Sequence, residues 1–321
     1  MEQNTKNGII LLLVGVALVS VQDVLMKLLS ATFPIHQILV IRYAMALLLF
    51  GWLVAIVGDI GKLRTKNLKI QLIRGTLAFL AGISYYLALA VVPLADTVAL
   101  FFTAPLFVSI FGYFFFGEEV GRYRWMAVAV GFIGMLIMIR PGAGTFQLVA
   151  MFAVLSAVFY AFSLLLIRKA GSTESAVALS LYSMVCNLLG NSVMAIGFAL
   201  GWFSSIPFPS SVDFLTRAWV VPGNIELALI LGISVITVIA FYTITEAYRI
   251  ASPSLLSVFE YSALFWGVSW GILVWKDYPD SVSLIGIILM VGAGLFTIVR
   301  ETGNTLMPRK WFTGRAISRY R

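Results

Sequence analysis

The sequence predicts an all-α integral membrane protein, with ten transmembrane helices arranged as two inverted five-helix repeats. Three observations carry this prediction: the composition, the length and number of the apolar runs, and an internal repeat. Of the 321 residues, 61% are hydrophobic and only 11% are charged, whereas soluble domains carry about a quarter charged residues. A water-soluble fold of this size has no interior large enough for so much apolar surface, so we expect a multi-pass membrane protein.

The apolar runs are continuous and about twenty residues long, which is the length that a helix needs to cross a bilayer core of about 30 Å. Strands of an outer-membrane barrel would instead alternate apolar and polar residues over about ten positions. No signal-peptide cleavage site follows the first run, so we expect it to remain as a helix. The expected spans are 8–29, 35–57, 70–91, 95–116, 124–140, 147–167, 176–200, 225–248, 252–275 and 282–299.

The distribution of basic residues supports ten spans through the positive-inside rule. With a cytoplasmic N-terminus, 16 of the 22 Lys and Arg residues fall in cytoplasmic segments and three, Arg140, Arg217 and Lys276, fall in outer segments. The other three, Lys27, Arg42 and Arg74, lie within spans. The same distribution accounts for the net charge of +8, so we expect no nucleic-acid partner. We expect both termini in the cytoplasm and the bacterial inner membrane as the location.

The two halves of the chain resemble each other in the same order. "YYLALAVVPLADTVALF" (85–101) aligns with "YTITEAYRIASPSLLSV" (242–258) at an offset of 157 residues, and "GMLIMIR" (134–140) aligns with "GLFTIVR" (294–300) at 160. Because each half holds five helices, the second half enters the membrane with the opposite orientation, as in many secondary transporters. The expected units are a repeat at 1–143, an inverted repeat at 144–300 and a basic cytoplasmic tail at 301–321.

Several stretches carry a family resemblance. They are "QDVLMK" (22–27), "VIRYAMALLLF" (40–50), "QLIRGTLAF" (71–79) and the run at 98–142, which joins T-A-P, G-E-E, a basic turn and a helix rich in small residues. The sequence thereby resembles the drug/metabolite transporter superfamily, specifically its EamA-type ten-helix members. This resemblance implies a secondary active transporter of a small organic metabolite that works by alternating access. The second half departs from the pattern, because Glu260 stands where the first half has Thr103.

Charged side chains inside the spans indicate the substrate path, because each costs about 2.5–3.5 kcal/mol at mid-membrane unless it pairs or meets water. Asp23 and Lys27 lie four residues apart and can pair on one face of the first helix, and Arg42 lies at a similar depth in the second. Glu260 has no cation within four residues on its own helix. The alternatives are a structural salt bridge for Asp23 and Arg42, and a side chain that extends toward the membrane surface for Lys27.

These residues predict a substrate site in the middle of the bundle, with proton coupling through Glu260 and Asp23. Paired acidic and basic groups favour a zwitterionic or mixed-charge substrate, such as an amino-acid-like compound, S-adenosylmethionine or a vitamin. Aromatic side chains join the site as walls, with packing as the alternative for each. The expected substrate-binding residues are Asp23, Arg42, Tyr86, Tyr160, Glu260, Tyr261 and Trp266.

The sequence shows neither a P-loop nor a metal-ligand spacing, so we expect no catalytic residue, no metal and no cofactor. The expected partners are a small-molecule substrate, the lipid bilayer and protons, and the chain is expected to be a monomer or a homodimer. Three other functions stay open: a multidrug or metabolite exporter, a membrane-embedded enzyme and a regulatory membrane subunit. Transport of a substrate without chemical change would distinguish an exporter from a membrane-embedded enzyme.

Overall fold

The computed structural model gives the chain an all-helical fold, which confirms the all-α part of the predicted fold class. The structure describes residues 2–58, 60–117, 121–140, 149–170, 174–202, 215, 217–251, 256 and 259–306. Regular structure in these residues is helical. Three sequence predictions lie outside the described residues: the acidic pair Glu118 and Glu119, the repeat boundary at 143 and the tail beyond residue 306.

The helices follow the apolar runs of the sequence. The first half of the chain forms α1 (Glu2–Ser30), α2 (Ile35–Val57), η1 (Ile60–Leu63), α3 (Leu68–Leu89), α4 (Leu94–Phe101), α5 (Ala104–Phe116) and α6 (Arg122–Ile139). The second half forms α7 (Ala150–Ala170), α8 (Ala176–Ala199), α9 (Asn224–Ile250), α11 (Ser262–Trp270), the π-helical turn η3 (Gly271–Trp275) and α12 (Ser281–Leu306). The expected spans fall on these helices, and the fourth is divided between α4 and α5.

Six helical segments of the described chain are long and apolar enough to cross a membrane. They are Lys6–Ser30, Ile35–Val57, Leu68–Leu89, Leu94–Phe115, Ala176–Ala199 and Asn224–Ile250. Four shorter apolar helical segments accompany them, namely Trp125–Ile139, Ala150–Leu166, Ser262–Trp275 and Ser281–Phe296. Large apolar side chains such as Leu48, Phe114 and Ile288 are exposed on the outside of the bundle, as expected of a surface that faces lipid. The chain is therefore a multi-pass membrane protein.

Local signals set several helix ends. Pro34 precedes α2, and Gly58 ends this helix in the left-handed conformation, with φ 76°, which glycine adopts without steric strain. The side chain of Asn67 accepts a hydrogen bond from the Ile70 amide and so caps the start of α3. These residues explain why the apolar runs end where they do.

Two of the expected spans are interrupted. The fourth breaks at Phe102 and Thr103, and Pro105, which has no backbone N–H to donate, lies in the first turn of the helix that follows. The ninth breaks at Tyr261, after which α11 begins. Thr103 and Glu260, which the sequence alignment of the two halves places at equivalent positions, therefore both lie at a helix break.

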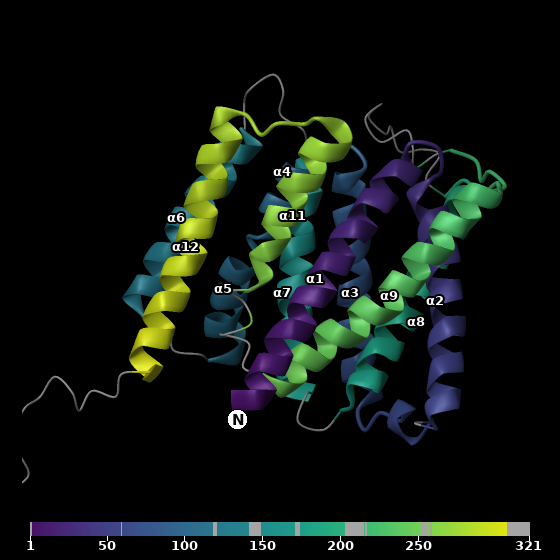
Figure 1. Cartoon of the computed structure of the whole chain (residues 1–321), viewed down its shortest axis with the longest axis horizontal. Helices are drawn as coiled ribbons and strands as arrows, with labels where there is room; N and C mark the ends of the chain where they lie inside the picture. Colours follow the sequence, from purple (N-terminus) through teal and green to yellow (C-terminus); the bar gives the residue numbers. More distant parts are fainter. Residues whose placement is uncertain are drawn as a thin grey trace, which may run out of the picture.

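Helices from the two halves are interleaved in space. α1 packs against α9, α3 packs against α7 and α8, and α6 stands beside α12 on one side of the bundle (Figure 1). α1 begins and α12 ends at one end of the bundle, which we call the proximal end. At the opposite, distal end, α1 ends and α12 begins (Figure 1).

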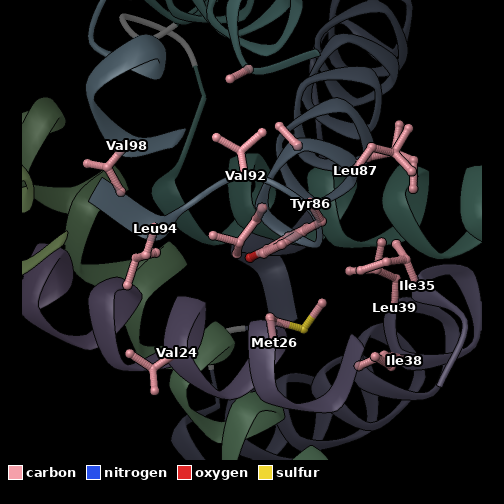
Figure 2. Close-up of a cluster of buried hydrophobic side chains, with 14 of the residues drawn as sticks. Val24, Met26, Ile35, Ile38, Leu39, Tyr86, Leu87, Val92, Leu94 and Val98 are labelled. Carbon is pink, nitrogen blue, oxygen red and sulfur yellow. The ribbon is translucent and has the colours of Figure 1, made fainter. Parts of the chain in front are cut away.

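The larger cluster of buried apolar side chains draws on helices of both halves, and part of it lies between α1, α2, α3 and α4. Met26 and Ile38 have no exposed surface, and Leu94 is 1% exposed. Figure 2 shows Tyr86 within this apolar cluster. A polar hydroxyl so placed needs hydrogen-bond partners, and these partners define the site described next.

Candidate functional site

Arg42 lies at the centre of a buried polar network. Its side chain is only 1% exposed and extends from α2 toward α3 and α9. Nε donates a hydrogen bond to Thr237 Oγ1 over 2.8 Å, and Nη1 donates to Tyr86 Oη over 2.9 Å. The guanidinium also lies 4.7 Å from the ring centroid of Tyr43, which provides a cation–π contact.

Gln22 closes this network into a ring. Its Nε2 donates to Tyr86 Oη over 2.6 Å, and its Oε1 accepts from Thr237 Oγ1 over 3.0 Å. We call Gln22, Arg42, Tyr86 and Thr237, which come from α1, α2, α3 and α9, the Arg42 network. The Thr237 hydroxyl also lies 2.8 Å from the Ile233 carbonyl of its own helix. Tyr86 Oη accepts twice and therefore keeps its own proton to donate.

Asp23 lies beside this network but does not pair with Lys27, so the expected local ion pair is wrong. Asp23 is 4% exposed, and its Oδ2 accepts from Tyr85 Oη over 2.9 Å. Lys27 Nζ instead donates to the Val92 carbonyl over 2.5 Å and lies 5.5 Å from the ring centroid of Trp275. The long stem of Lys27 explains this, because it lets the ammonium reach the distal end of the bundle.

The second oxygen of Asp23, Oδ1, is buried and has no hydrogen-bond partner among the described residues. The charge of Asp23 acts on the Arg42 guanidinium, so the two predicted site residues do share one environment. A buried carboxylate oxygen without a partner is unfavourable for folding. It is the kind of group that a bound ligand or a proton can satisfy.

Glu260 forms a second polar group, with tyrosines of α7 and α9. The hydroxyls of Tyr160 on α7 and Tyr248 on α9 donate hydrogen bonds to its carboxylate. The next residue, Tyr261, stacks on Phe102 with ring centroids 5.1 Å apart. The structure thus brings Tyr160 into hydrogen-bond contact with Glu260, whereas the ring of Tyr261 lies against Phe102.

A row of aromatic rings connects the two acidic residues. The ring of Tyr85 lies 5.4 Å from that of Phe101, and Phe101 lies 5.1 Å from Tyr160. Tyr85 donates to Asp23, and Tyr160 donates to Glu260. We call Tyr85, Phe101 and Tyr160 the aromatic row.

Trp266 makes packing contacts, in an apolar cluster that also includes Tyr248. Its ring stacks on Trp270 at 6.4 Å, and it packs against a small apolar cluster that includes Leu12, Val16 and Leu256. Trp270 Nε1 donates to Ser20 Oγ over 3.2 Å, which ties α11 to α1. The structure therefore places Trp266 among packing residues.

Three site residues carried no recognisable signal in the sequence. Thr237 lies in a helix with other Thr and Ser residues, and nothing local distinguishes the hydroxyl that reaches Arg42. Tyr85 and Tyr248 are two of 12 tyrosines in the chain. Gln22 did carry a signal, because it precedes Asp23 in an otherwise apolar run. Among the described residues, no group of three or more His, Cys, Asp or Glu side chains is placed to hold a metal ion.

Residues 6–140 match the EamA-like transporter family. The pseudopaline exporter CntI of Pseudomonas aeruginosa is 27% identical over 90% of this chain and 94% of its own length. The S-adenosylmethionine uptake transporter of Rickettsia prowazekii is 22% identical over 92% of this chain and 93% of its own length. The riboflavin transporter of Vibrio cholerae is 28% identical over 86% of this chain and 87% of its own length.

The fold also resembles that of a protein with a solved crystal structure. The two superpose with a TM-score of 0.61 at 16% sequence identity, over 98% of this chain and 100% of the other. The two chains therefore share a fold. Together with the family match, these comparisons confirm the resemblance expected from the sequence.

Proposed function

Because residues 6–140 belong to the EamA-like transporter family, we propose that this chain is a secondary transporter that moves a small organic metabolite across a membrane by alternating access. The similar proteins named above are transporters of small molecules rather than enzymes. A multi-pass helical chain with buried charges suits the same task. The substrate class that we propose is a zwitterionic metabolite, either amino-acid-like or related to S-adenosylmethionine or a vitamin.

The proposed architecture is ten transmembrane helices in two inverted repeats, at 1–143 and 144–300. In such a repeat, α1, α2 and α3 are equivalent to α7, α8 and α9. The contact of α1 with α9 is then equivalent to the contact of α7 with α3. In the same way, the contact of α3 with α8 is equivalent to the contact of α9 with α2. All four contacts occur in the structure, which supports the proposal.

The two helix breaks support a two-fold relation as well. Thr103 at the first break and Glu260 at the second are equivalent in the sequence alignment. Their neighbours Phe102 and Tyr261 stack on each other. Interrupted helices that meet between inverted repeats are a common feature of the substrate sites of secondary transporters.

For orientation, we propose cytoplasmic termini in a bacterial inner membrane. The bias of Lys and Arg toward the segments at the proximal end is the basis of this assignment. The distal end, with Arg140, Arg217 and Lys276, then faces outward. The chain acts as a monomer or a homodimer.

In the proposed site, Arg42 and Tyr86 bind the carboxylate of the substrate, and Asp23 and Glu260 bind its amino group or carry a coupling proton. Tyr160 and Tyr261 line the path between the two halves, and we assign Trp266 a packing role. The observation that carries this proposal is the Arg42 network, a buried cation held by four helices of both halves. Opening of the network during transport would free donors for a substrate anion.

Uptake by the purified chain in liposomes tests the proposed function. Labelled amino acids, S-adenosylmethionine and riboflavin are offered, and the recovered label is checked for chemical change. We expect accumulation of one of these compounds unchanged, and a drop of at least tenfold in Arg42→Lys, which keeps the charge but loses the forked donors. Arg249→Lys is the control, because Arg249 pairs with Glu246 on the surface of α9. Uptake of none of the compounds, or a chemically altered product, contradicts the proposal.

An exporter is the second candidate, because one of the relatives is named as an exporter. Direction is tested with everted membrane vesicles and right-side-out vesicles from the same cells. Accumulation that is confined to everted vesicles indicates export. Accumulation that is confined to right-side-out vesicles indicates uptake.

A further inference from the structure

A cavity of about 500 Å³ lies at the distal end of the bundle. The start of α4, the end of α6 and the segment between η3 and α12 form its walls. None of its lining residues belongs to the Arg42 network or to the Glu260 group. Its volume is that of a site for a small metabolite.

The cavity wall carries charges of both signs. Its charged lining residues are Asp96, Arg140, Lys276, Asp277 and Asp280. Arg140 and Asp280 form a salt bridge with each other, so this pair is already satisfied. Two acidic residues and one lysine therefore remain to meet a ligand.

Asp96 is the acidic residue of this wall that has a buried, unpaired carboxylate oxygen. Ser283 hydrogen-bonds to its carboxylate, but its Oδ1 is buried and has no partner among the described residues. An acceptor in this position favours a donor with a positive charge. A substrate ammonium group meets this requirement.

Lys27 adds a second cation at the edge of the cavity. Its Nζ donates to the carbonyl of Val92, a lining residue, and the charges of Asp277 and Asp96 act on it. Lys27 also lies one helical turn beyond Asp23 on α1. The cavity therefore borders the same face of α1 that carries the buried carboxylate of the proposed central site.

We propose that this cavity is a second, outer binding site for a small zwitterion. Asp96 and Asp277 take the amino group, and Lys276 takes the carboxylate. Tyr278 and Met138, which also line the cavity, provide apolar contact for the rest of the ligand. The inference rests on the proposed function, in which such a site would hold substrate at the mouth of the path.

Calorimetric binding to the purified full chain in lipid nanodiscs tests this site. The probe is L-phenylalanine, with phenethylamine and 3-phenylpropionate as analogues that lack one charged group each. We expect phenylalanine to bind at least tenfold more tightly than either analogue. Asp96→Asn and Lys276→Gln should each weaken phenylalanine binding at least tenfold, because each removes a charged hydrogen-bond partner. Glu246→Gln, at the proximal end of α9, should leave it unchanged.

Three outcomes overturn the site: no binding of phenylalanine, equal binding of an analogue, or unchanged affinity in both cavity variants. Lys276 is exposed, so its variant remains informative even where Asp96→Asn folds poorly. Uptake in liposomes separates this inference from the proposed function. If phenylalanine binds in a manner that depends on Asp96 but the chain transports no metabolite, the proposed function is rejected and the outer site is retained. If the chain transports a metabolite but shows no such binding, the outer site is rejected and the proposed function is retained.

Discussion

The ring of Phe102 stacks on the ring of Tyr261, with centroids 5.1 Å apart and planes inclined by 19°. Phe102 lies at the break between α4 and α5, and Tyr261 lies at the start of α11, so this contact joins the two halves of the chain. The hydroxyl of Tyr261 lies against α12 at Gly294. A Cβ at that position would lie 1.3 Å from Tyr261 Oη. Gly294 is therefore the residue that makes room for the tyrosine.

Gly294→Ala should destabilise the protein, although alanine is the better helix former by about 1 kcal/mol. The new methyl group overlaps the Tyr261 ring, and overpacking of this kind costs about 1–3 kcal/mol. The apparent melting temperature of the purified protein in detergent reports this change. Tyr261→Ala, introduced together with Gly294→Ala, should remove the added penalty.

Gly292→Ala is the matched control for this prediction. It lies on the same helix, and a Cβ there would meet no atom within 4 Å. We expect its melting temperature to equal or exceed that of the wild type. Equal stability of Gly294→Ala and Gly292→Ala would show that Tyr261 is not wedged against α12.

Thr237→Val should destabilise the bundle by about 1–3 kcal/mol, because it leaves buried groups of Arg42 and Gln22 without a hydrogen-bond partner. Valine has nearly the shape of threonine, so packing is preserved. Thr243→Val is the control, since its buried hydroxyl bonds to Ala240 of its own helix over 3.2 Å. Chemical unfolding in detergent should separate the two variants. An equal effect of both would mean that the Arg42 network adds nothing beyond a local helix contact.

Much of the fold follows from local sequence, because the length of an apolar run and the residues that end it determine a membrane helix. Asp23, Arg42 and Glu260 were identifiable for a similar reason, as each interrupts such a run. The pairing of these residues was not predictable. The four-residue spacing of Asp23 and Lys27 indicates a local ion pair, but Tyr85 on another helix bonds to Asp23 instead. Which helix supplies a partner depends on packing between segments that are distant in sequence.

The salt bridge between Arg140 and Asp280 should respond to acid and to salt. Asp280 also caps α12, where its Oδ1 accepts from the Ser283 amide over 2.8 Å. The Arg140 guanidinium and the hydrogen bond from the Ser283 amide lower the pKa of Asp280 from 3.8 to about 2. A lowered pKa means that the pair stabilises the folded state above about pH 4 and that this contribution is lost as the pH falls toward 2. Both side chains are substantially exposed, so solvent screening limits the contribution of the salt bridge to stability to about 0.2–1 kcal/mol.

Asp280→Asn isolates this effect, because asparagine retains the cap but not the charge. The wild type should melt at a higher temperature than the variant at pH 7, and the difference should shrink at pH 3 and in 1 M salt. Arg140→Gln should show the same pattern. A difference that stays constant with pH and salt would assign the stabilisation to the cap alone.

Glu260→Gln should abolish uptake driven by a pH gradient and leave exchange of substrate across the liposome membrane intact. Glutamine keeps the size of the side chain and a carbonyl that accepts from Tyr160 or Tyr248, but it carries no proton that can be released. Glu246→Gln, at an acidic residue that pairs with Arg249 at the proximal end, should behave as the wild type. Gradient-driven uptake that persists in Glu260→Gln would remove this residue from coupling.

Exchange is the measurement that decides between binding and coupling at Glu260. Exchange needs the substrate to bind and the two halves to rearrange, but it needs no net movement of protons. A variant that loses exchange and uptake together would place the carboxylate in substrate binding, as the partner of an amino group. Tyr160→Phe and Tyr248→Phe refine the assignment, because each removes one donor to Glu260 while the carboxylate can still titrate. If Glu260 carries the proton, these variants should shift the pH at which uptake is half-maximal upward, since loss of a donor to the ionised form favours protonation.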